Sequence, residues 1–283
     1  MILSFRQIKT KIRGVDNIHK ITHAMEMISI AKLRPTQSQL SALKHYYLKI
    51  EELLKDLLAD AKGVTHPLTE KRQNINRIAL CLITSDTGLC SNYNNNIIHL
   101  AEDFINKNGR EKIILVCVGR KGLNYFTKIG MQVTQHYTEL NGRYSQGTAD
   151  KILNALTDIF LVNQADEVYI AYTYFESATR YRPLIEKFLN IDSDRKEDLV
   201  YILEPDISAV LGELIPVYIF NKLKLIILNA FTAEHSTRVV AMSEATKNAK
   251  ELLESLTLLR NKVRQASITA EIMEVVSSAE ALR

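Results

Sequence analysis

Apolar and small residues recur at alternating spacings of three and four along the C-terminal part of the chain. A repeat that averages 3.5 residues keeps one stripe of a helix facing a partner helix over several heptads. Neither glycine nor proline occurs between residues 217 and 283, so nothing there interrupts a helix. The pattern predicts one half of a coiled coil. Its seam comprises Met242, Ala245, Ala249, Leu252, Leu256, Leu259, Val263, Ala266, Ala270 and Met273.

The N-terminal part of the chain carries a second helical pattern. Apolar side chains follow the same alternating spacing at Leu40, Leu43, Tyr47, Ile50, Leu54, Leu57 and Ala61. An earlier apolar face, with some drift, comprises Ile8, Ile12, Val15, Ile18, Ile21, Met25 and Ile28. Pro35 interrupts the run, and an interior proline costs a helix about 3 kcal/mol and kinks or ends it. We therefore expect one bent helix or two helices in line.

The middle of the chain alternates short β-branched or aromatic runs with helical stretches. The runs predict β-strands at 78–84, 113–118, 131–137 and 167–175, and the stretches predict helices at 94–107, 120–128 and 145–162. This alternation is typical of an open, mostly parallel sheet of the doubly wound, Rossmann-like kind. Pro183, Pro205 and Pro216 are expected to punctuate the return to the C-terminal helix.

The order of these elements predicts an α/β protein in three parts. They are an N-terminal coiled-coil helix at 1–62, a central α/β domain at 63–205 and a C-terminal coiled-coil helix at 206–283. The simplest closure pairs the two terminal helices as a long antiparallel two-helix coiled coil. Because the last helix is the longer one, its C-terminal tail should project alone.

The segment from Arg264 to Arg283 carries apolar or small residues on nearly every face. A helix that is apolar all round is normally buried, and the sequence offers nothing else in the chain to bury this one. We expect another protein to form a sleeve around it. The large apolar residues are Ile268, Ile272, Met273, Val275, Val276 and Leu282.

The composition, with 46% hydrophobic and 24% charged residues among 283, is that of an ordered soluble protein. The apolar runs are shorter than the roughly 18 residues that span a bilayer, and the N-terminus lacks an apolar stretch of the signal-peptide type. Three irregularly spaced cysteines suit neither a disulfide framework nor a Cys-x-x-Cys zinc site. The expected location is the cytoplasm, or a membrane surface without entry into the bilayer.

The basic character of the chain belongs to its N-terminal segment. Residues 1–34 hold seven Lys or Arg and two acids, a net charge of +5, against +4 for the whole chain. Such a helix suits nucleic acid, anionic lipid or an acidic protein surface, and equally a solvated face with no partner. Phe5 is the only aromatic residue of the segment, which disfavours nucleic acid.

Three motifs raise the question of a chemical site. Ser85–Asn94 (SDTGLCSNYN) lies where an α/β fold places a phosphate loop, but without the glycines of such a loop, so a capping and packing turn is favoured. His19 and His23 lie four apart on a helix, yet no third metal ligand is evident. Residues 119–122 (GRKG) are similar to the loop of an RNA-binding KH module without the rest of that module, and most simply form a turn. No catalytic arrangement is evident, and we predict no catalytic residue, cofactor or metal.

Segments at both ends of the chain and after the first strand match a known family. They are IKTKIRGVDNIHKITHAMEMISIAKLR, SDTGLCSNYN, EHSTRVVAMSEATKNAKELLESL and RQASITAEIMEVV. In order and at matching length they resemble the γ subunit of F-type ATP synthases, over essentially the whole chain. Thr87 stands where that family usually has Arg, Ser91 where it often has Gly, and Ser278 where Gly is expected.

The resemblance implies a central rotor shaft. In the family the terminal helices form an antiparallel coiled coil inside a ring of three α and three β subunits. The α/β domain lies outside the ring, near the ε subunit and the membrane ring of c subunits. Ion flow turns the shaft, which drives ATP synthesis, or hydrolysis, at the β subunits. The resemblance thus implies a non-catalytic, nucleic-acid-free peripheral subunit at the cytoplasmic face of the bacterial inner membrane.

The resemblance also implies contacts with β that couple rotation to catalysis without taking part in the chemistry. These coupling residues are Lys20, Met25, Arg238, Met242, Arg264, Gln265, Thr269 and Glu271. An alternative hypothesis of a different class is a coiled-coil adaptor protein whose Rossmann-like domain binds a nucleotide. Binding of ATP by the chain alone would discriminate between the two.

Overall fold

The computed structural model describes residues 4–60, 66–70, 72, 74–191, 204 and 206–282. The chain divides into an α/β unit, Ser29–Arg238, and a coiled-coil unit, Met1–Ile28 with Val239–Arg283. Two long helices, α1 (Phe5–Asp60) and α5 (Ile207–Ala281), belong to both units. The domain limits expected at 62/63 and 205/206 involve residues outside the described ranges and stay predictions.

Both long helices contain a proline. Helix α1 is a single helix through Pro35, so the alternative of two separate helices is wrong. Pro216 does not punctuate the return to the C-terminal helix as expected, because α5 begins at Ile207, close to the predicted start at 206, and contains this proline. Because proline has no backbone N–H, the carbonyl four residues before each proline lacks its helical hydrogen bond. Pro35 and Ala31 are exposed, as are Pro216 and Gly212, so water can hydrate both carbonyls.

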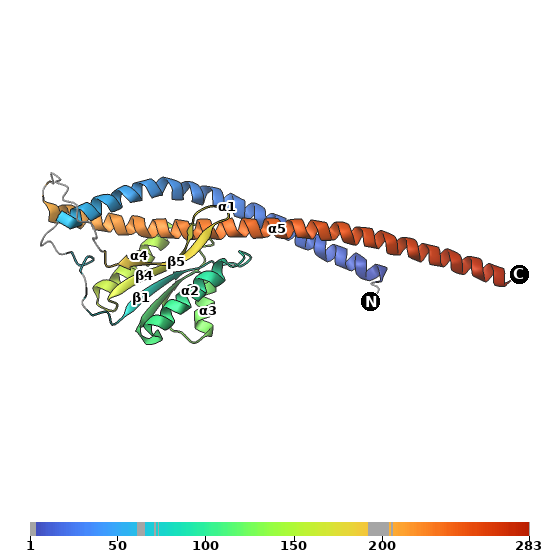
Figure 1. Ribbon diagram of the computed structural model, residues 1–283, viewed down its shortest axis with the longest axis horizontal. Helices are drawn as coiled ribbons and strands as arrows, with labels where there is room; N and C mark the ends of the chain where they lie inside the picture. Colours follow the sequence, from blue (N-terminus) through green and yellow to red (C-terminus); the bar gives the residue numbers. More distant parts are fainter. Residues whose placement is uncertain are drawn as a thin grey trace. The chain divides into compact units, whose positions relative to one another are not determined.

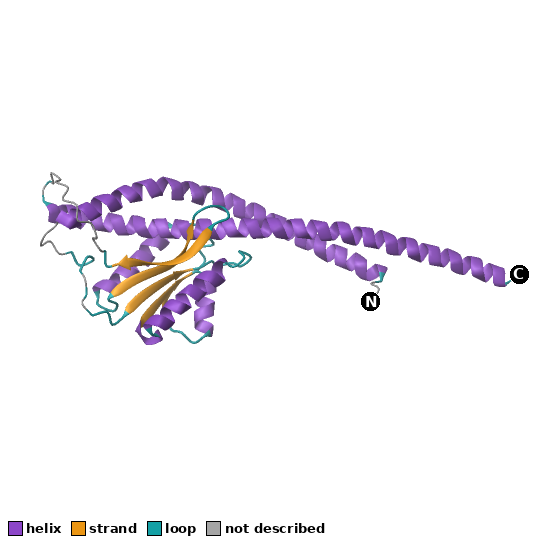
Figure 2. Ribbon diagram, in the orientation of Figure 1, coloured by secondary structure: helices purple, strands orange, loops and turns teal. Residues whose placement is uncertain are grey.

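A five-stranded sheet lies at the centre of the α/β unit (Figure 2). Its order is β3-β2-β1-β4-β5; the first four strands run parallel and β5 runs antiparallel to β4. This confirms the expected mostly parallel sheet. The strands are β1 (Ile78–Ile83), β2 (Ile113–Val118), β3 (Val133–Tyr137), β4 (Glu167–Phe175) and β5 (Tyr181–Leu189). The other helical elements are α2 (Tyr93–Asn108), η1 (Arg110–Lys112), α3 (Arg120–Lys128) and α4 (Gln146–Leu161).

Helices cover both faces of this sheet (Figure 1). Alternate β1 residues point to opposite sides: Leu80 and Leu82 pack with α2 and α3, while Cys81 and Ile83 pack with α4, α1 and α5. Every residue of β1 is buried, as expected for a central parallel strand that is covered on both faces. The part of α5 within this unit is therefore a core helix of the domain.

Strand β5 was missing from the sequence prediction. Its sequence, YRPLIEKFL, contains Pro183, which was interpreted as punctuation between elements. Proline cannot donate a ladder hydrogen bond, but it is tolerated on an edge strand, and β5 lies at the edge of the sheet. The predicted strand at 131–137 begins later, at Val133.

In the coiled-coil unit α1 and α5 run antiparallel. Val15 packs with Ala249 and Leu256, with Ile12 and Leu253 beside them. Further along, the hydroxyls of Thr22 and Thr246 lie 3.0 Å apart. This confirms the antiparallel two-helix coiled coil expected from the spacing.

The seam on α5 differs from the prediction in one of its two alternating series and at its C-terminal end, where the predicted members Ala266, Ala270 and Met273 are exposed. Met242, Ala249 and Leu256 are buried as predicted. Leu252 and Leu259, however, are 43% and 39% exposed, and Leu253 packs in the seam instead. A seam through Leu253 and a seam through Leu252 both have an average spacing of 3.5 residues, so the spacing alone could not select between them.

The buried stripe of α1 follows a strict heptad whose middle positions are polar. Every seventh residue from Ile8 to Leu57 is buried: Ile8, Val15, Thr22, Ser29, Thr36, Leu43, Ile50 and Leu57. The predicted apolar face through Ile18, Ile21 and Ile28 is wrong as a seam, because these side chains are 54%, 58% and 56% exposed.

Within the described ranges, one helix contains a stretch that is apolar and long enough to cross a membrane. This is α5, and 61% of the stretch is buried inside the protein. Core helices of soluble proteins meet the same criterion, so the stretch is weak evidence for a membrane span.

Candidate functional site

The carboxyl ends of the parallel strands meet at one edge of the sheet. In open α/β sheets, ligands bind outside this edge at the point where the strand order reverses. Here the order reverses between β1 and β4. Residues 229–238 of α5 lie against the loops that follow β1, β3 and β4, as the following contacts show.

Residues at or beyond the carboxyl ends of these three strands have hydrogen bonds to α5. Beyond β1, the buried hydroxyl of Tyr93 donates to the carbonyl of Ala230 at 3.0 Å. At the end of β4, the backbone N–H of Phe175 donates to Asn229 Oδ1 at 3.4 Å. In the loop after β4, the carbonyl of Ala178 accepts a hydrogen bond from Ser236 Oγ at 2.9 Å. The crevice that a doubly wound domain offers to a ligand therefore holds a helix of the same chain.

His235 connects α5 to the loop after β3. Its Nε2 lies 2.8 Å from the carbonyl oxygen of Gly142, and its Nδ1 lies 3.3 Å from Arg238 Nη1. Because a carbonyl accepts and a guanidinium donates, these contacts select the neutral tautomer with the proton on Nε2. Burial lowers the pKa of His235 to about 4.

Arg238 and Glu234 form an ion pair in the same place. Arg238 Nη2 lies 2.9 Å from Glu234 Oε1, and the two side chains are only 5% and 1% exposed. The guanidinium also donates to the carbonyls of Thr87 and Gly88 and to Thr87 Oγ1. Burial raises the pKa of Glu234, and the charge of Arg238 opposes that shift. Removing one member of such a pair leaves an unpaired buried charge, which costs about 3–5 kcal/mol.

The Ser85–Asn94 segment is a packing turn. Asp86 accepts from the backbone N–H groups of Arg120, at the start of α3, and Asn141, in the loop after β3. The side-chain oxygen of Asn94 accepts from the N–H of Ser85. Ser91 has φ +50°, a conformation that glycine adopts at no steric cost. The side chains of this turn thus join loops and α5 to one another.

The two other motifs also have structural surroundings. Gly119 of the GRKG segment has φ +96°, and a Cβ there would lie 2.1 Å from the carbonyl oxygen of Thr84. Gly119 is therefore the close-packed N-cap of α3, and Arg120, Lys121 and Gly122 belong to the first turn of this helix. The rings of His19 and His23 are 6.5 Å apart, and no group of three or more metal-ligating residues gathers within the described part of the chain.

The eight predicted coupling residues differ in exposure. Lys20 is exposed and pairs with Asp16 at 2.7 Å, and Met25 is half-buried. Arg264, Gln265, Thr269 and Glu271 are exposed on α5. Arg238 and Met242 are buried, so contact with a partner through either would require the side chain to leave its present neighbours. Contact of the eight with a partner stays a prediction.

The tail of α5 has no cover within the described chain. Every residue from Arg264 to Leu282 is exposed, which confirms that its apolar side chains lack an intramolecular partner. Val275 is 69% exposed, Met273 60% and Ile272 57%.

A group of buried polar residues on α5 is not predicted by the sequence pattern. Glu234, His235, Ser236, Thr237 and Arg238 form a polar run within a long helix, and all five are buried. The available signal was the pairing of an acid and an arginine four residues apart between two apolar stretches. On its own that pattern is equally typical of a solvated face.

Comparison with known proteins gives consistent results. A sequence model of the family described as ATP synthase matches residues 4–282. The ATP synthase gamma chain of Moorella thermoacetica is 38% identical over 280 residues, covering 98% of this chain and 99% of that one. The ATP synthase gamma chain of Desulforamulus reducens is 36% identical over 283 residues, covering 99% of each chain.

Solved structures with a similar fold include chains of two mitochondrial ATP synthases. A chain from the Euglena gracilis enzyme, solved with OSCP, F1 and the c-ring, matches with a TM-score of 0.69 at 19% identity and covers 98% of this chain and 94% of that one. A chain of the central stalk and c-ring structure from Tetrahymena thermophila matches with a TM-score of 0.62 at 20% identity, over 80% of this chain and 99% of that one.

Proposed function

The chain belongs to the ATP synthase gamma chain family, and from this premise we propose that it is the central rotor shaft of an F-type ATP synthase. It couples ion movement through the membrane sector to ATP synthesis or hydrolysis at the β subunits. Relatives that match over nearly their whole length are named ATP synthase gamma chain, which supports the proposal.

The exposed tail of α5 is the observation that carries this function. An apolar helix without cover loses the free energy of burial, roughly 25 cal/mol for each Å² of apolar surface left in water. The largest apolar side chains of residues 264–282, Ile268, Ile272, Val275 and Val276, lie on one side of the helix. Met273 and the alanines extend the apolar surface beyond that side, so one flat neighbour covers only part of it. A collar of α and β subunits can surround the tail and still let it turn.

A second apolar stripe supports contact with β. Ile18, Ile21 and Ile28 are exposed on α1, at spacings that place them on one face with the predicted coupling residue Met25. Lys20 adds a basic side chain to the same helix. We propose that this stripe contacts β, together with Arg264, Gln265, Thr269 and Glu271 on the tail.

Arg238 and Met242 take a supporting role in this proposal. Arg238 holds the turn at Thr87 and Gly88 against α5, so its effect on coupling passes through the position of that turn. Met242 is buried in the coiled-coil seam and sets the packing of the helix pair.

The loops at the sheet edge connect the α/β domain to α5, which is the basis of its proposed role in transmitting torque. A domain that is driven at one end must transmit torque to the helix without slipping. Hydrogen bonds between three separate loops and residues 235–238 of α5 suit that task. The ε subunit and the ring of c subunits are the proposed partners of this domain, at the cytoplasmic face of a bacterial inner membrane.

We place the ATP chemistry in the β subunits, so that this chain acts as a non-catalytic subunit. The alternative, an adaptor that binds a nucleotide in its Rossmann-like domain, is not favoured, because α5 lies against the loops where that ligand would bind. A single ATP-binding site on the purified chain alone would contradict the rotor proposal.

The test of the proposal replaces the apolar tail while keeping the helix. A variant with Ile268→Ser, Ile272→Ser, Val275→Ser and Val276→Ser should assemble poorly with α and β, or rotate with reduced torque, because the collar loses its apolar contact. The measurements are recovery of the complex by size-exclusion chromatography and torque in a single-molecule assay.

The matched control is Glu274→Gln with Glu280→Gln, which changes the tail but not its apolar surface. It should behave as the unaltered chain. Deletion of Arg264–Arg283 should likewise impair assembly or rotation while the α/β domain stays folded by circular dichroism. Unchanged assembly and torque in both the serine variant and the deletion would show that the tail contact is dispensable.

A further inference from the structure

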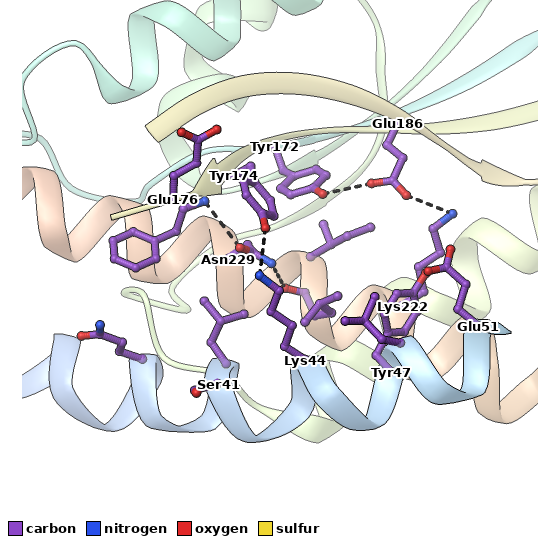
Figure 3. Close-up of a pocket in the computed structure, with 16 residues that line it drawn as sticks. Ser41, Lys44, Tyr47, Glu51, Tyr172, Tyr174, Glu176, Glu186, Lys222 and Asn229 are labelled. Atoms are coloured by element: carbon purple, nitrogen blue, oxygen red, sulfur yellow. Dashed lines mark hydrogen bonds and ion pairs between the residues drawn. The ribbon is translucent and has the colours of Figure 1, made fainter. Parts of the chain in front are cut away.

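A cavity of about 390 Å³ lies between α1, α5 and the two strands at one edge of the sheet, β4 and β5 (Figure 3). All of its lining residues belong to the α/β unit. Its volume falls in the range of roughly 300–1,000 Å³ that is typical of small-molecule sites. Neither the family match nor the contacts of the rotor proposal assign it a ligand.

The walls of the cavity are largely aromatic and aliphatic. Tyr47 on α1 and Tyr172 and Tyr174 on β4 line it (Figure 3). Two of these rings are fixed by neighbours: Tyr47 stacks on Tyr218 with ring centroids 5.7 Å apart, and the Tyr172 hydroxyl donates to Glu186 at 3.0 Å. Aliphatic side chains complete the walls, from Leu40, Leu48, Leu225 and Ile226. A flat apolar ligand would meet surfaces that are already in position.

The carboxylates that line the cavity are already neutralised. Glu51 pairs with Lys55 at 3.1 Å, Glu176 with Arg182 at 3.1 Å, and Glu186 with Lys222 at 3.2 Å. Lys222 also donates to the carbonyl of Lys187 at 2.8 Å. These groups have their counterions, so they offer little attraction to a cationic ligand.

Lys44 differs from them. Its Nζ lies 3.3 Å from the Tyr174 hydroxyl and 6.0 Å from the centre of that ring. Within the described ranges it is the one cation lining the cavity with no carboxylate within 4.0 Å. Ser41 and Gln37 precede it on the same side of α1 and also line the cavity, which adds hydrogen-bonding groups beside the ammonium.

We propose that this cavity binds a small aromatic carboxylate, with its ring between Tyr47, Tyr172 and Tyr174 and its carboxylate at Lys44. Lys44 is exposed at the edge of the cavity, where its ammonium can pair with an anion, and the apolar walls favour a ligand with an apolar body. A nucleotide is a poor match, since one lysine without a glycine-rich loop cannot hold a polyphosphate. The ligand would touch α1, α5 and β4 together and so stabilise the packing of α1 on the domain.

The test uses the full-length chain with 2-naphthoate as probe and the uncharged 2-naphthamide as its isostere. Isothermal titration calorimetry should show saturable one-to-one binding of naphthoate and at least about tenfold weaker binding of naphthamide. Lys44→Met should reduce naphthoate affinity about tenfold and bring it to the level of naphthamide, while Lys44→Arg should retain most of it. The matched control is Lys49→Met, which removes an exposed lysine of the same helix that does not line the cavity.

Ser41→Phe gives an independent test by filling the cavity. In a variant whose circular dichroism and melting temperature match those of the unaltered chain, binding of both probes should be lost. The proposal is overturned by any of three results: no saturable naphthoate binding, equal affinity for the two probes, or binding that survives both Lys44→Met and Ser41→Phe. None of these results bears on the rotor assignment, which depends on the partners of the coiled coil.

Discussion

The contact between Gly142 and His235 leaves no room for a side chain at position 142. A Cβ there would lie 2.3 Å from His235 Nε2, and Gly142 has φ +66°. We predict that Gly142→Ala lowers the free energy of unfolding by about 2–4 kcal/mol, because the substitution adds a clash to the backbone strain of about 1 kcal/mol. Urea denaturation followed by circular dichroism measures this change.

Gly130→Ala is the matched control for that substitution. Gly130 has a similar φ of +74°, but nothing lies within 4 Å of its Cβ position. Gly130→Ala should lower the free energy of unfolding only by the backbone strain, about 1 kcal/mol. Equal losses in the two variants would mean that the close approach of His235 to Gly142 contributes nothing to stability.

The buried imidazole of His235 predicts a loss of stability in acid. Its pKa is about 4 in the folded chain and about 6.5 when unfolded, because burial disfavours the charged form. Between these pH values the unfolded chain binds the proton and the folded chain does not. The free energy of unfolding should therefore fall as the pH drops from about 6.5 to about 4, by on the order of 3 kcal/mol from this residue.

His235→Gln isolates this contribution, since glutamine can still donate to Gly142 and accept from Arg238. Glu234 works in the opposite direction: burial raises its pKa, so it favours the folded chain as the pH falls. Glu234 is present in both proteins, as are the nearby charges of Lys32 and Arg238, and cancels to first order in the comparison. Urea denaturation from pH 4 to 7 should give a flatter profile for His235→Gln. Parallel profiles would contradict the buried neutral imidazole.

Of the individual residues in the candidate site, only some could be predicted from the sequence. The Ser85–Asn94 segment was correctly interpreted as a packing turn, because a phosphate loop needs glycines that it lacks. The buried run from Glu234 to Arg238 could not be found, since a polar run on a helix has the same sequence whether solvent or a neighbouring loop faces it. Only the fold brings Thr87 and Gly142 to that run.

Among the helices and strands, the heptad of α1 shows how polar residues can occupy a coiled-coil seam. Thr22 and Thr246 are hydrogen-bonded across the helix pair at 3.0 Å. We predict a coupling energy of about 0.5–1 kcal/mol in a double-mutant cycle with Thr22→Val and Thr246→Val. Unfolding of the full chain monitored by helical circular dichroism provides the four free energies.

Thr10 and Thr269 are the control pair for this cycle. Each donates only to a carbonyl of its own helix, Arg6 and Gln265 respectively. Their cycle should give a coupling energy near zero. A coupling energy at or below this control value for Thr22 and Thr246 would show that the hydrogen bond between the helices does not stabilise the seam.

Strong periodicity explains which elements were predictable. The runs at 113–118 and 167–175 match β2 and β4, since β-branched and aromatic runs between helices have few other structures. Strand β5 was not predicted because Pro183 is atypical of strands away from a sheet edge, and because most residues of β5 are only half-buried. Which leucine of α5 lies in the seam was not predictable, because Leu252 and Leu253 fit a 3.5-residue repeat equally well.

For the whole molecule, the family assignment joins observations made separately on the two units. The α/β unit holds α5 by hydrogen bonds from loops after three strands, and the coiled-coil unit ends in a tail that no described residue covers. A helix that is anchored in one domain and carries an exposed apolar surface at its end is suited to transmit torque into another protein. Neither feature requires a catalytic group in this chain.

Rotation of the chain inside a ring of α and β subunits tests this account most directly. Burial raises the pKa of Cys81, Cys90 and Cys117, so a cysteine introduced by Lys107→Cys on the surface of α2 should react alone with a biotin maleimide. A bead attached at this position, on complexes immobilised through β, then reports the motion of the shaft when ATP is added. We predict continuous rotation in one direction that stops when ATP is removed. Complexes that hydrolyse ATP while the bead stays still, or moves without a direction, would contradict the account.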